Sequence, residues 1–368
     1  MKSFYIAVYL FTGITAAIAA LKKNLIIDTD LFSDVDDAGA LLLAATSPKV
    51  NLLAVNVNHP STYSALAASA ILAHYGHPKI PIGIRRPLTN ATFFDSWYFA
   101  LGEYTSKVAF HWSGGTLAWG YAEEAWDPVA LYRKVLSGAE DGSVTIASIG
   151  FLDNVSFMAV YSRRGPLIRW QLSGLLNSTA DSYSDLNGRD LVGRKVTELV
   201  VMGGGYPSGY SWNFWGSNGS LAAHVVNTWE GQMVFVGDDV GKDVKSGGEL
   251  MSAGPKTDPV RMAYIYYSYY EPTSSWDPLA ILYAIGGLGE LFKYGNEYGY
   301  NHVNANGANR WVWDRKVQNQ FFLRLKVSNE TAAQELDRLL LKGALSVVEQ
   351  HTAEAPGRKH VGSAHTEL

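Results

Sequence analysis

Residues 25–37 read LIIDTDLFSDVDD, an apolar run that passes directly into five carboxylates within ten positions. Three consecutive aliphatic residues predict a strand that is buried on both faces. Carboxylates this close together repel one another, and each raises the pKa of its neighbours. Because this repulsion is costly at the end of a buried strand, the stretch indicates that something positive or reactive is bound there.

Further apolar runs alternate with helical patterns along the chain. The expected strands are 25–27, 52–57, 144–149, 199–202 and 233–236. The expected helices between them are 37–45, 64–75, 129–136 and 221–229. Continuous apolar strands that alternate with helices predict an α/β fold, with an open, mostly parallel β-sheet flanked by helices and a Rossmann-like core.

Each expected strand is followed by polar residues or glycines. The exits are Asp28-Thr29-Asp30, Asn58-His59, Gly150 to Asn154, Met202 to Gly205, and Gly237-Asp238-Asp239. In open α/β sheets, ligands bind outside the carboxyl ends of the strands. We therefore expect these five exits to outline a single site.

The composition excludes several classes of function. The formal net charge is −4 and the sequence has no Lys/Arg-rich block, so nucleic acid is not expected as a partner. The chain has no cysteine, which rules out a cysteine nucleophile and a thiolate metal site. Its 368 residues are ample for a large core.

The two ends of the chain have the character of processing and sorting segments. Residues 1–20 carry Lys2, an apolar run and an Ala-x-Ala pattern, which is typical of a signal peptide. A membrane anchor is the alternative, but Gly13 and Thr15 interrupt the run, so no stable membrane insertion is expected after cleavage. Residues 21–350 are expected to form one domain and residues 351–368 a polar tail. The protein is expected to be secreted, or retained in the ER lumen if the terminal HTEL (residues 365–368) acts as a retrieval signal.

If the protein enters the secretory pathway, five Asn-x-Ser/Thr patterns become candidate N-glycosylation sites. We expect glycans on Asn90, Asn177, Asn218 and Asn329. Asn154 also matches the pattern, but it lies in a strand exit where a glycan would block the site. We therefore expect Asn154 to be unglycosylated and to support the site from behind.

The acidic stretch has three interpretations from its residues alone. Clustered carboxylates can hold a hard cation such as Ca²⁺. A strand that ends in Asp-x-Asp also occurs in haloacid-dehalogenase-type phosphatases, with Gly237-Asp238-Asp239 as a second acidic motif, although Phe32 is unusual at its position in such a loop. The third interpretation is a solvated acidic turn without function.

Six motifs in order resemble the nucleoside hydrolases of the inosine-uridine preferring family. Asp28-Thr-Asp30 with Asp36-Asp37-Ala38 resembles the N-terminal signature of that family in its longer form. The other five are Asn58, Gly150-Phe-Leu-Asp153-Asn154, Val201-Met202-Gly203-Gly204, Trp212-Asn213-Phe214 and Trp276-Asp277-Pro278. Each motif is weak alone, and their ordered combination is specific.

The resemblance implies a Ca²⁺-dependent N-ribohydrolase that splits a ribonucleoside, a small-molecule substrate, into base and ribose. It implies calcium ligands at Asp30, Asp37, the backbone carbonyl of Asp153 and Asp277, with Asp30 also taking the proton from the attacking water. The implied substrate-binding residues are Asp36, Asn58, Asn213 and Asp277 on the ribose hydroxyls, and Met202 lining the sugar pocket. Asp28 would brace the loop. A homo-oligomer is left open.

Three departures from the family pattern bear on activity. Ser211 replaces a Glu that reaches the 5′ end of the sugar, and Asp153 replaces the Thr of the calcium loop. Trp276 stands at the position of a general-acid His, and it resembles the purine-preferring members in which aromatic residues stack on the base. Ser211 and Asp153 keep open a weakened enzyme, or a riboside-binding or interaction protein without turnover.

The remaining polar and aromatic candidates have structural explanations. Asp34 is expected to be solvated or to cap a helix. His59 and His224 are expected to be structural. The aromatic residues of 93–98 are expected to pack at the surface, with stacking against the base as the alternative.

Overall fold

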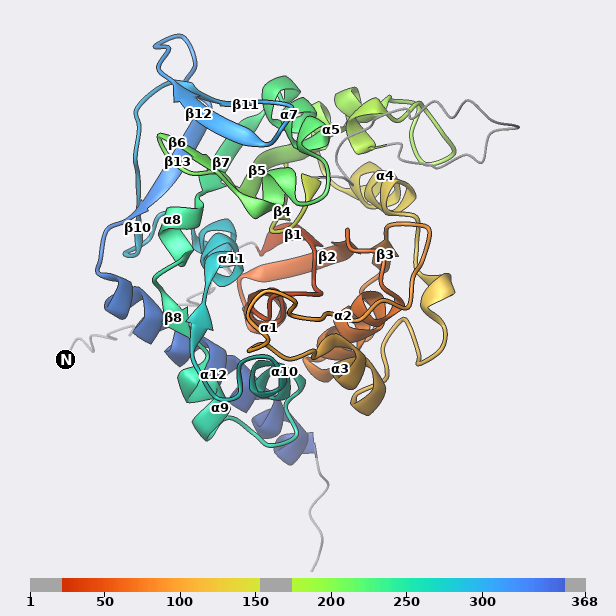
Figure 1. The fold of residues 1–368 in the computed structure, drawn as a ribbon. Coiled ribbons are helices and arrows are strands. Elements are labelled where there is room, and N and C mark those ends of the chain that lie inside the picture. Colours follow the sequence, from red (N-terminus) through yellow and green to blue (C-terminus); the bar gives the residue numbers. More distant parts are fainter. Residues whose placement is uncertain (1–21, 153–173, 355–368) are drawn as a thin grey trace, which may run out of the picture.

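The computed structural model describes residues 22–152 and 174–354. Within these residues the centre of the molecule is an eight-stranded sheet in the order β10-β13-β7-β5-β4-β1-β2-β3 (Figure 1). All neighbouring strands in it are parallel except β10 and β13. The strands are β1 (Lys23–Thr29), β2 (Val50–Val57), β3 (Ile82–Ile84), β4 (Val144–Ser148), β5 (Val196–Met202), β7 (Gln232–Val236), β10 (Phe292–Tyr294) and β13 (Gln320–Leu325). The expected α/β fold with a mostly parallel sheet is confirmed.

Helices cover both faces of this sheet (Figure 1). One face packs against α1 (Asp36–Thr46), α2 (Thr62–His74), α3 (Thr105–His111), α9 (Gly248–Ala253), α10 (Pro259–Ser268), α11 (Trp276–Gly286) and α12 (Asn329–Glu354). The other face packs against α4 (Pro128–Gly138), α5 (Gly188–Lys195) and α7 (Gly219–Thr228).

The apolar run in β1 contributes to both cores. Leu25 and Ile27 belong to the core on the α1 face, whereas Ile26 belongs to the core on the α4 face. All three side chains are fully buried. Successive side chains of a strand point to opposite faces, so a central strand covered on both sides needs an apolar residue at every position. This explains why the run is continuous rather than alternating.

Two smaller sheets and several short helices surround the carboxyl ends of the strands. The small sheets are β11 (Tyr300–Val303), β12 (Ala308–Val312) and β6 (Ser208–Tyr210), and β8 (Lys245–Ser246) with β9 (Thr273–Ser274). The short helices are α6 (Trp212–Trp215), α8 (Asp238–Gly241), η1 (Ala122–Glu124) and η3 (Leu175–Asn177). Because β6 pairs with β12, the chain is held in place where it enters α6.

The expected strands and helices all exist in the described part of the chain, and their ends differ from expectation by at most three residues. Helix α12 runs to Glu354, so residues 351–354 belong to this helix rather than to a polar tail. The expected signal peptide, the retrieval tetrapeptide, Asp153 and Asn154 lie outside the described residues.

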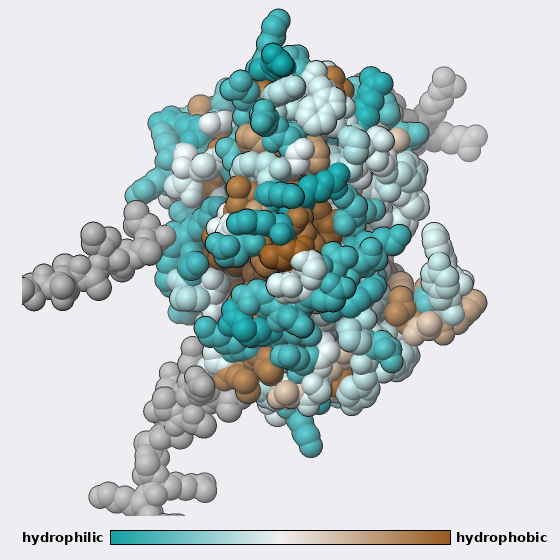
Figure 2. All heavy atoms as spheres, turned by 90° about the vertical axis from the view of Figure 1, so that its left-hand side faces the viewer, coloured by the Kyte–Doolittle hydropathy of each residue, from teal (hydrophilic) through white to brown (hydrophobic). Residues whose placement is uncertain are grey.

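On the face that Figure 2 shows, an apolar area near the centre is bordered by polar side chains. In the described ranges, no helix combines the length and the apolar character that crossing a bilayer requires.

Candidate functional site

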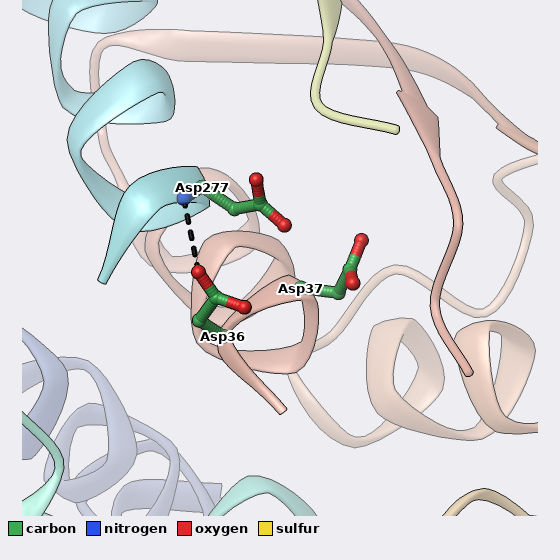
Figure 3. Close-up of side chains that lie close together, drawn as sticks. All are labelled: Asp36, Asp37 and Asp277. Carbon is green, nitrogen blue, oxygen red and sulfur yellow. Dashed lines mark hydrogen bonds between the residues drawn. The ribbon is translucent and has the colours of Figure 1, made fainter. Parts of the chain in front are cut away.

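Three carboxylates meet between helices α1 and α11 (Figure 3). Asp36 and Asp37 lie in the first turn of α1, and Asp277 lies in the first turn of α11. One carboxylate oxygen from each lies within 4.8 Å of the others. The three residues are at most 5% exposed. Two segments 240 positions apart thus place like charges together out of water.

Backbone groups hold this arrangement. The Oδ2 atom of Asp36 accepts hydrogen bonds from the backbone N–H of Trp276 (2.9 Å) and of Asp277 (3.1 Å) (Figure 3). These N–H groups belong to the first turn of α11, where a helix carries partial positive charge. The hydroxyl of Thr29 donates to the carboxylate of Asp37. The carboxylate of Asp36 therefore links the acidic stretch to the start of α11.

The electrostatics of the cluster favour protonation or a bound cation. Burial and the charge of Asp34 raise the pKa of Asp36 to about 7. Burial, then the charges of Asp30 and Asp36, raises the pKa of Asp37 well above its ordinary value. The pKa of Asp277 is raised by burial and then by the charges of Asp36 and Asp37. Without a positive partner these carboxylates cannot all be ionised at neutral pH.

The set of donor atoms fits a hard divalent cation. Carboxylate oxygens are the ligands that Ca²⁺ and Mg²⁺ prefer, and three of them offset the charge of such an ion. Of the expected calcium ligands, Asp37 and Asp277 belong to this group. Asp36, which we expected on the ribose, is its third member. Asp30 lies outside the group of three, and Asp153 lies outside the described residues.

Asp30 nevertheless adjoins the cluster. Its side chain is 8% exposed and lines the same pocket. Burial, then the charges of Asp34 and Asp36, raises the pKa of Asp30 well above its ordinary value. A side chain at Gly150 would place its Cβ 2.4 Å from the backbone nitrogen of Asp30. Only glycine allows the exits of β1 and β4 to approach this closely.

A pocket of about 470 Å³ opens over these carboxylates at the carboxyl ends of the strands. Among the expected substrate-binding residues, six line it: Asp36, Met202, Ser211, Asn213, Trp276 and Asp277. Asn58 does not. No Lys or Arg from the described ranges is part of its lining.

The two asparagines expected on the ribose have their amide groups engaged within the protein. The Nδ2 atom of Asn58 donates to Asp28 (2.8 Å) and to the backbone carbonyl of Phe151 (2.7 Å). The other carboxylate oxygen of Asp28 accepts from the hydroxyl of Tyr132 at 2.8 Å. Asp28 and Asn58 therefore tie the exits of β1, β2 and β4 together.

Asn213 lies at the wall of the pocket. Its Nδ2 donates to the backbone carbonyls of Ile149 (3.0 Å) and Met202 (3.2 Å). Its Oδ1 atom is thereby oriented by two strand ends, β4 and β5. The sequence alone does not indicate whether the amide of Asn213 bonds to the protein backbone or to a ligand.

We expected Asp34 to be solvated or to cap a helix, and the structure contradicts this prediction. Its carboxylate accepts a hydrogen bond from the hydroxyl of Tyr267 (2.7 Å), and its backbone carbonyl accepts one from Tyr104 (2.6 Å). It lines the pocket, and burial raises its pKa. Val35, not Asp34, is the N-cap residue of α1. The partner on α10 lies 233 positions away, so the sequence near Asp34 carries no signal for this contact.

The aromatic side chains at the pocket are Trp276 and Trp212. Trp276 donates its indole N–H to the backbone carbonyl of Asp238 at 2.9 Å, which fixes the ring. Trp212, which we did not single out, is 44% exposed and lines the pocket as well. The signal was present, because Trp212 precedes Asn213 in one of the family motifs.

The aromatic loop after β3 lies outside the pocket lining. Phe94, Trp97 and Tyr98 are at least 72% exposed. Phe93 contacts Phe32 and Tyr267, with ring centroids 6.3 Å apart in each case. Only Phe93 of this loop thus packs next to the acidic stretch.

A second pocket, of about 900 Å³, shares Trp212 with the first. Its lining includes Asn58, His59, Arg85 and Arg86, and no carboxylate from the described residues. His59 stacks on Phe32 with ring centroids 3.6 Å apart. Burial and the charge of Arg85 lower the pKa of His59 to about 4, so this ring is neutral at pH 7.

Comparison with known proteins identifies the fold. No family model matches the sequence, and no curated protein matches it. Solved structures do match. The inosine-uridine preferring nucleoside hydrolase from Bacillus anthracis has a TM-score of 0.57 at 16% identity, over 87% of this chain and 99% of that one. This chain has the nucleoside hydrolase fold.

Two further structures give the same result. An inosine-guanosine nucleoside hydrolase has a TM-score of 0.58 at 17% identity, over 87% of this chain and 99% of that one. The purine-preferring ribonucleoside hydrolase from Gardnerella vaginalis has a TM-score of 0.56 at 15% identity, over 89% of this chain and 100% of that one. The resemblance found in six short motifs is thus confirmed at the level of the whole fold.

Proposed function

We propose that this protein is a Ca²⁺-dependent hydrolase of the N-glycosidic bond of ribonucleosides, which releases the free base and ribose. One observation carries the proposal. On a nucleoside hydrolase fold, the pocket at the carboxyl ends of the strands is lined by the buried carboxylates Asp36, Asp37 and Asp277. The matched structures are described as acting on inosine, uridine, guanosine or purine ribonucleosides, which supports this substrate class.

The carboxylates of the pocket suit the charge that develops during this reaction. Cleavage of a glycosidic bond passes through an oxocarbenium-like state with positive charge on the sugar ring. Asp36, Asp37 and Asp277 stabilise that charge and orient the vicinal 2′- and 3′-hydroxyls of the ribose. A bound Ca²⁺ would supply an electrophile that activates and orients the attacking water.

Asp30 is the base in this proposal. It lines the pocket beside the cluster, and its raised pKa makes it a stronger base than an ordinary carboxylate. The backbone of Asp30 is wedged against Gly150, which keeps its carboxylate from moving away. The side chain of Asp153, whose backbone carbonyl we propose as a further cation ligand, lies outside the described residues.

The leaving base would be held by aromatic stacking. Trp276 and Trp212 line the pocket, and stacking or cation–π contact of about 0.5–2 kcal/mol favours a base that is becoming protonated. His59 is outside the lining and neutral at pH 7, which makes it a poor proton donor. We therefore propose a purine preference, with protonation of the base from solvent.

Product analysis tests the proposal. The purified protein is incubated with inosine, guanosine and uridine in the presence of Ca²⁺, and free base and ribose are quantified. We expect release of both products in equal amounts, faster from the purines. Asp239→Asn is the matched control, because Asp239 neighbours the site but pairs with Arg324 outside the pocket lining. Calcium binding without ribose release from any nucleoside would instead identify a riboside-binding protein.

The pocket does not favour the phosphatase alternative. A phosphomonoester is an anion, and the lining offers it carboxylates without a Lys or Arg from the described residues. Asp239, part of the supposed second acidic motif, is paired with Arg324. Release of phosphate from p-nitrophenyl phosphate with Mg²⁺ but no ribose from nucleosides would favour the phosphatase.

We also propose that the protein enters the secretory pathway and carries glycans. Asn90 and Asn177 are exposed, whereas Asn218 and Asn329 are half-buried. The side chain of Asn218 accepts from the backbone N–H of Ser220 at 3.0 Å, because it caps α7. Expression in a eukaryotic host followed by glycosidase treatment tests these sites, and sedimentation of the product tests whether the protein is a homo-oligomer.

A further inference from the structure

Asp238 differs from the other carboxylates of the pocket in its origin. The lining contains six aspartates, of which four come from the acidic stretch 30–37 and one, Asp277, from α11. Asp238 alone comes from the exit of β7, in the first turn of α8. It is outside the group of three that can share a cation.

The carboxylate of Asp238 is positioned by the residue that departs from the family motif. The fully buried hydroxyl of Ser211 donates to Asp238 Oδ1 at 2.9 Å. The indole N–H of Trp276 donates to the backbone carbonyl of Asp238 at 2.9 Å. Both neighbours line the same pocket. Asp238 is thus fixed in the wall of the pocket, between a serine and the tryptophan proposed to hold the base.

Helix α8, which carries Asp238, packs closely against the start of α11. A Cβ at Gly241, in the same short helix as Asp238, would lie 2.5 Å from the Cα of Trp276. Helix α8 and the start of α11 are therefore in close contact at this point. A hydrogen-bond acceptor that is held rigidly discriminates between ligands that can and cannot donate to it.

We propose that Asp238, positioned by Ser211, binds the 5′-hydroxyl of the ribose and makes the protein selective for ribosides with a free 5′-hydroxyl. This rests on the proposed function. A ribosyl group has three hydroxyls, and the vicinal 2′,3′ pair suits the wall of Asp36, Asp37 and Asp277. The 5′-hydroxyl is the remaining donor, and Asp238 is the pocket carboxylate that lies outside both the acidic stretch and the cation group. The same charge repels a 5′-phosphate, so nucleotides are excluded.

The test pairs a change in the protein with a change in the substrate. Inosine and 5′-deoxyinosine are compared with the wild-type protein and with Asp238→Ala. In the wild-type protein we expect kcat/KM for 5′-deoxyinosine to be about 10- to 100-fold lower, as for loss of a hydrogen bond to a charged group. Asp238→Ala should lose a similar factor with inosine and almost nothing with 5′-deoxyinosine. Equal loss with both substrates, or equal rates in the wild-type protein, overturns the proposal.

Two further variants separate recognition from folding. Asp238→Asn keeps an oxygen acceptor and should retain part of the preference for inosine. Ser211→Ala leaves the carboxylate but removes its positioning hydroxyl, so its loss should also be confined to inosine. Asp239→Asn, one residue along the same helix, should leave the ratio between the substrates unchanged. If the preference of Asp238→Asn for inosine over 5′-deoxyinosine is no larger than that of Asp238→Ala, the side chain at position 238 does not determine the selectivity.

Binding measurements distinguish failure of this inference from failure of the proposed function. With Ca²⁺ present, calorimetry gives the affinity for inosine and for 5′-deoxyinosine whether or not the bond is cleaved. Tighter binding of inosine without turnover supports the role of Asp238 and overturns hydrolysis. Hydrolysis of both compounds at equal rates supports hydrolysis and overturns the role of Asp238. No binding and no turnover with any nucleoside overturns both.

Discussion

The two pockets on either side of Trp212 differ in charge although they share a wall. The first is lined by six aspartates and, among the described residues, by no Lys or Arg. The second contains Arg85 and Arg86 and no carboxylate from those residues. The arginines are already engaged by the protein: Arg85 donates to Ser217 at 2.9 Å, and Arg86 binds the side chain of Glu123 and two backbone carbonyls.

The difference in charge between the two pockets indicates which of them suits a bound cation. In the second pocket both arginines are hydrogen-bonded within the chain. In the first pocket the buried carboxylates raise one another's pKa values and lack a basic partner from the described ranges. At neutral pH an array of this kind is stabilised by a bound cation or by protonation of some of its carboxylates. Removing a carboxylate or the ion should therefore affect the first pocket strongly and the second very little.

The largest effect is expected from Asp277→Asn. Asp277 contributes one of three carboxylates to the cation group and caps nothing itself, so the substitution keeps the shape and removes a charge. We predict a loss of turnover of about 10³-fold or more, because an electrophile supplies several kcal/mol of transition-state stabilisation. Ribose release and the increase in Tm on adding Ca²⁺ are measured. Unchanged calcium stabilisation would contradict the placement of the cation.

Asp30→Asn should have the next largest effect and separate chemistry from cation binding. The carboxylate lies in the same pocket but outside the group of three. Removing a general base typically costs about 10²- to 10⁴-fold in rate. The variant should fold and still be stabilised by Ca²⁺, as measured by thermal unfolding. If it remains fully active, Asp30 is not the base.

Chelation of metal ions should reveal a pH-dependent stability. Burial raises the pKa of Asp36 to about 7 from 3.8, so the folded chain binds this proton more tightly than the unfolded chain. The corresponding stabilisation is complete below pH about 4 and is lost as pH rises to about 7. We predict that the Tm of the chelated protein falls between pH 5 and 8, and that Ca²⁺ raises Tm more at pH 8 than at pH 5. An equal effect of Ca²⁺ at both pH values would contradict this.

The smallest effect is expected from Arg85→Ala in the second pocket. The charge of Arg85 contributes, after burial, to the low pKa of His59. The substitution should raise the pKa of His59, followed by NMR of the imidazole protons, while kcat for inosine changes by less than about twofold. A large loss of activity would show that the two pockets act as one.

The sequence was sufficient for the parts of the fold that its local patterns determine. The central strands β1, β2, β4, β5 and β7 were identified because burial on both faces requires continuous apolar runs. The central-sheet strands β3, β10 and β13 and the small sheets of β6, β11 and β12 and of β8 and β9 were not predicted, and most of these strands are short. The exits of β1, β4, β5 and β7 meet at one pocket as expected, whereas the exit of β2, Asn58-His59, lines the second pocket.

The contacts that join distant segments could not be predicted. The use of Asp36 to dock α11 depends on backbone groups 240 positions away. Asp34 was assigned a solvated role because Tyr267 lies far along the chain. Asp238 was noticed as part of a strand exit and of the acidic motif in the phosphatase alternative, and its hydrogen bond with Ser211 could be found only in the fold. Local pattern gives residue types near a site, whereas tertiary structure decides which oxygen atoms face the ligand.

The contact of Asp36 with the first N–H groups of α11 has a consequence for biosynthesis. The cation group needs α1, made early, and Asp277, made after three quarters of the chain. A nascent chain therefore cannot gain the ion until α11 has left the ribosome and packed on α1. Because a ligand that binds only the native state adds stability in proportion to the logarithm of its concentration, a calcium-rich compartment would favour finished molecules over incomplete ones. The metal would then stabilise the protein at a late stage of folding, in addition to its part in the reaction.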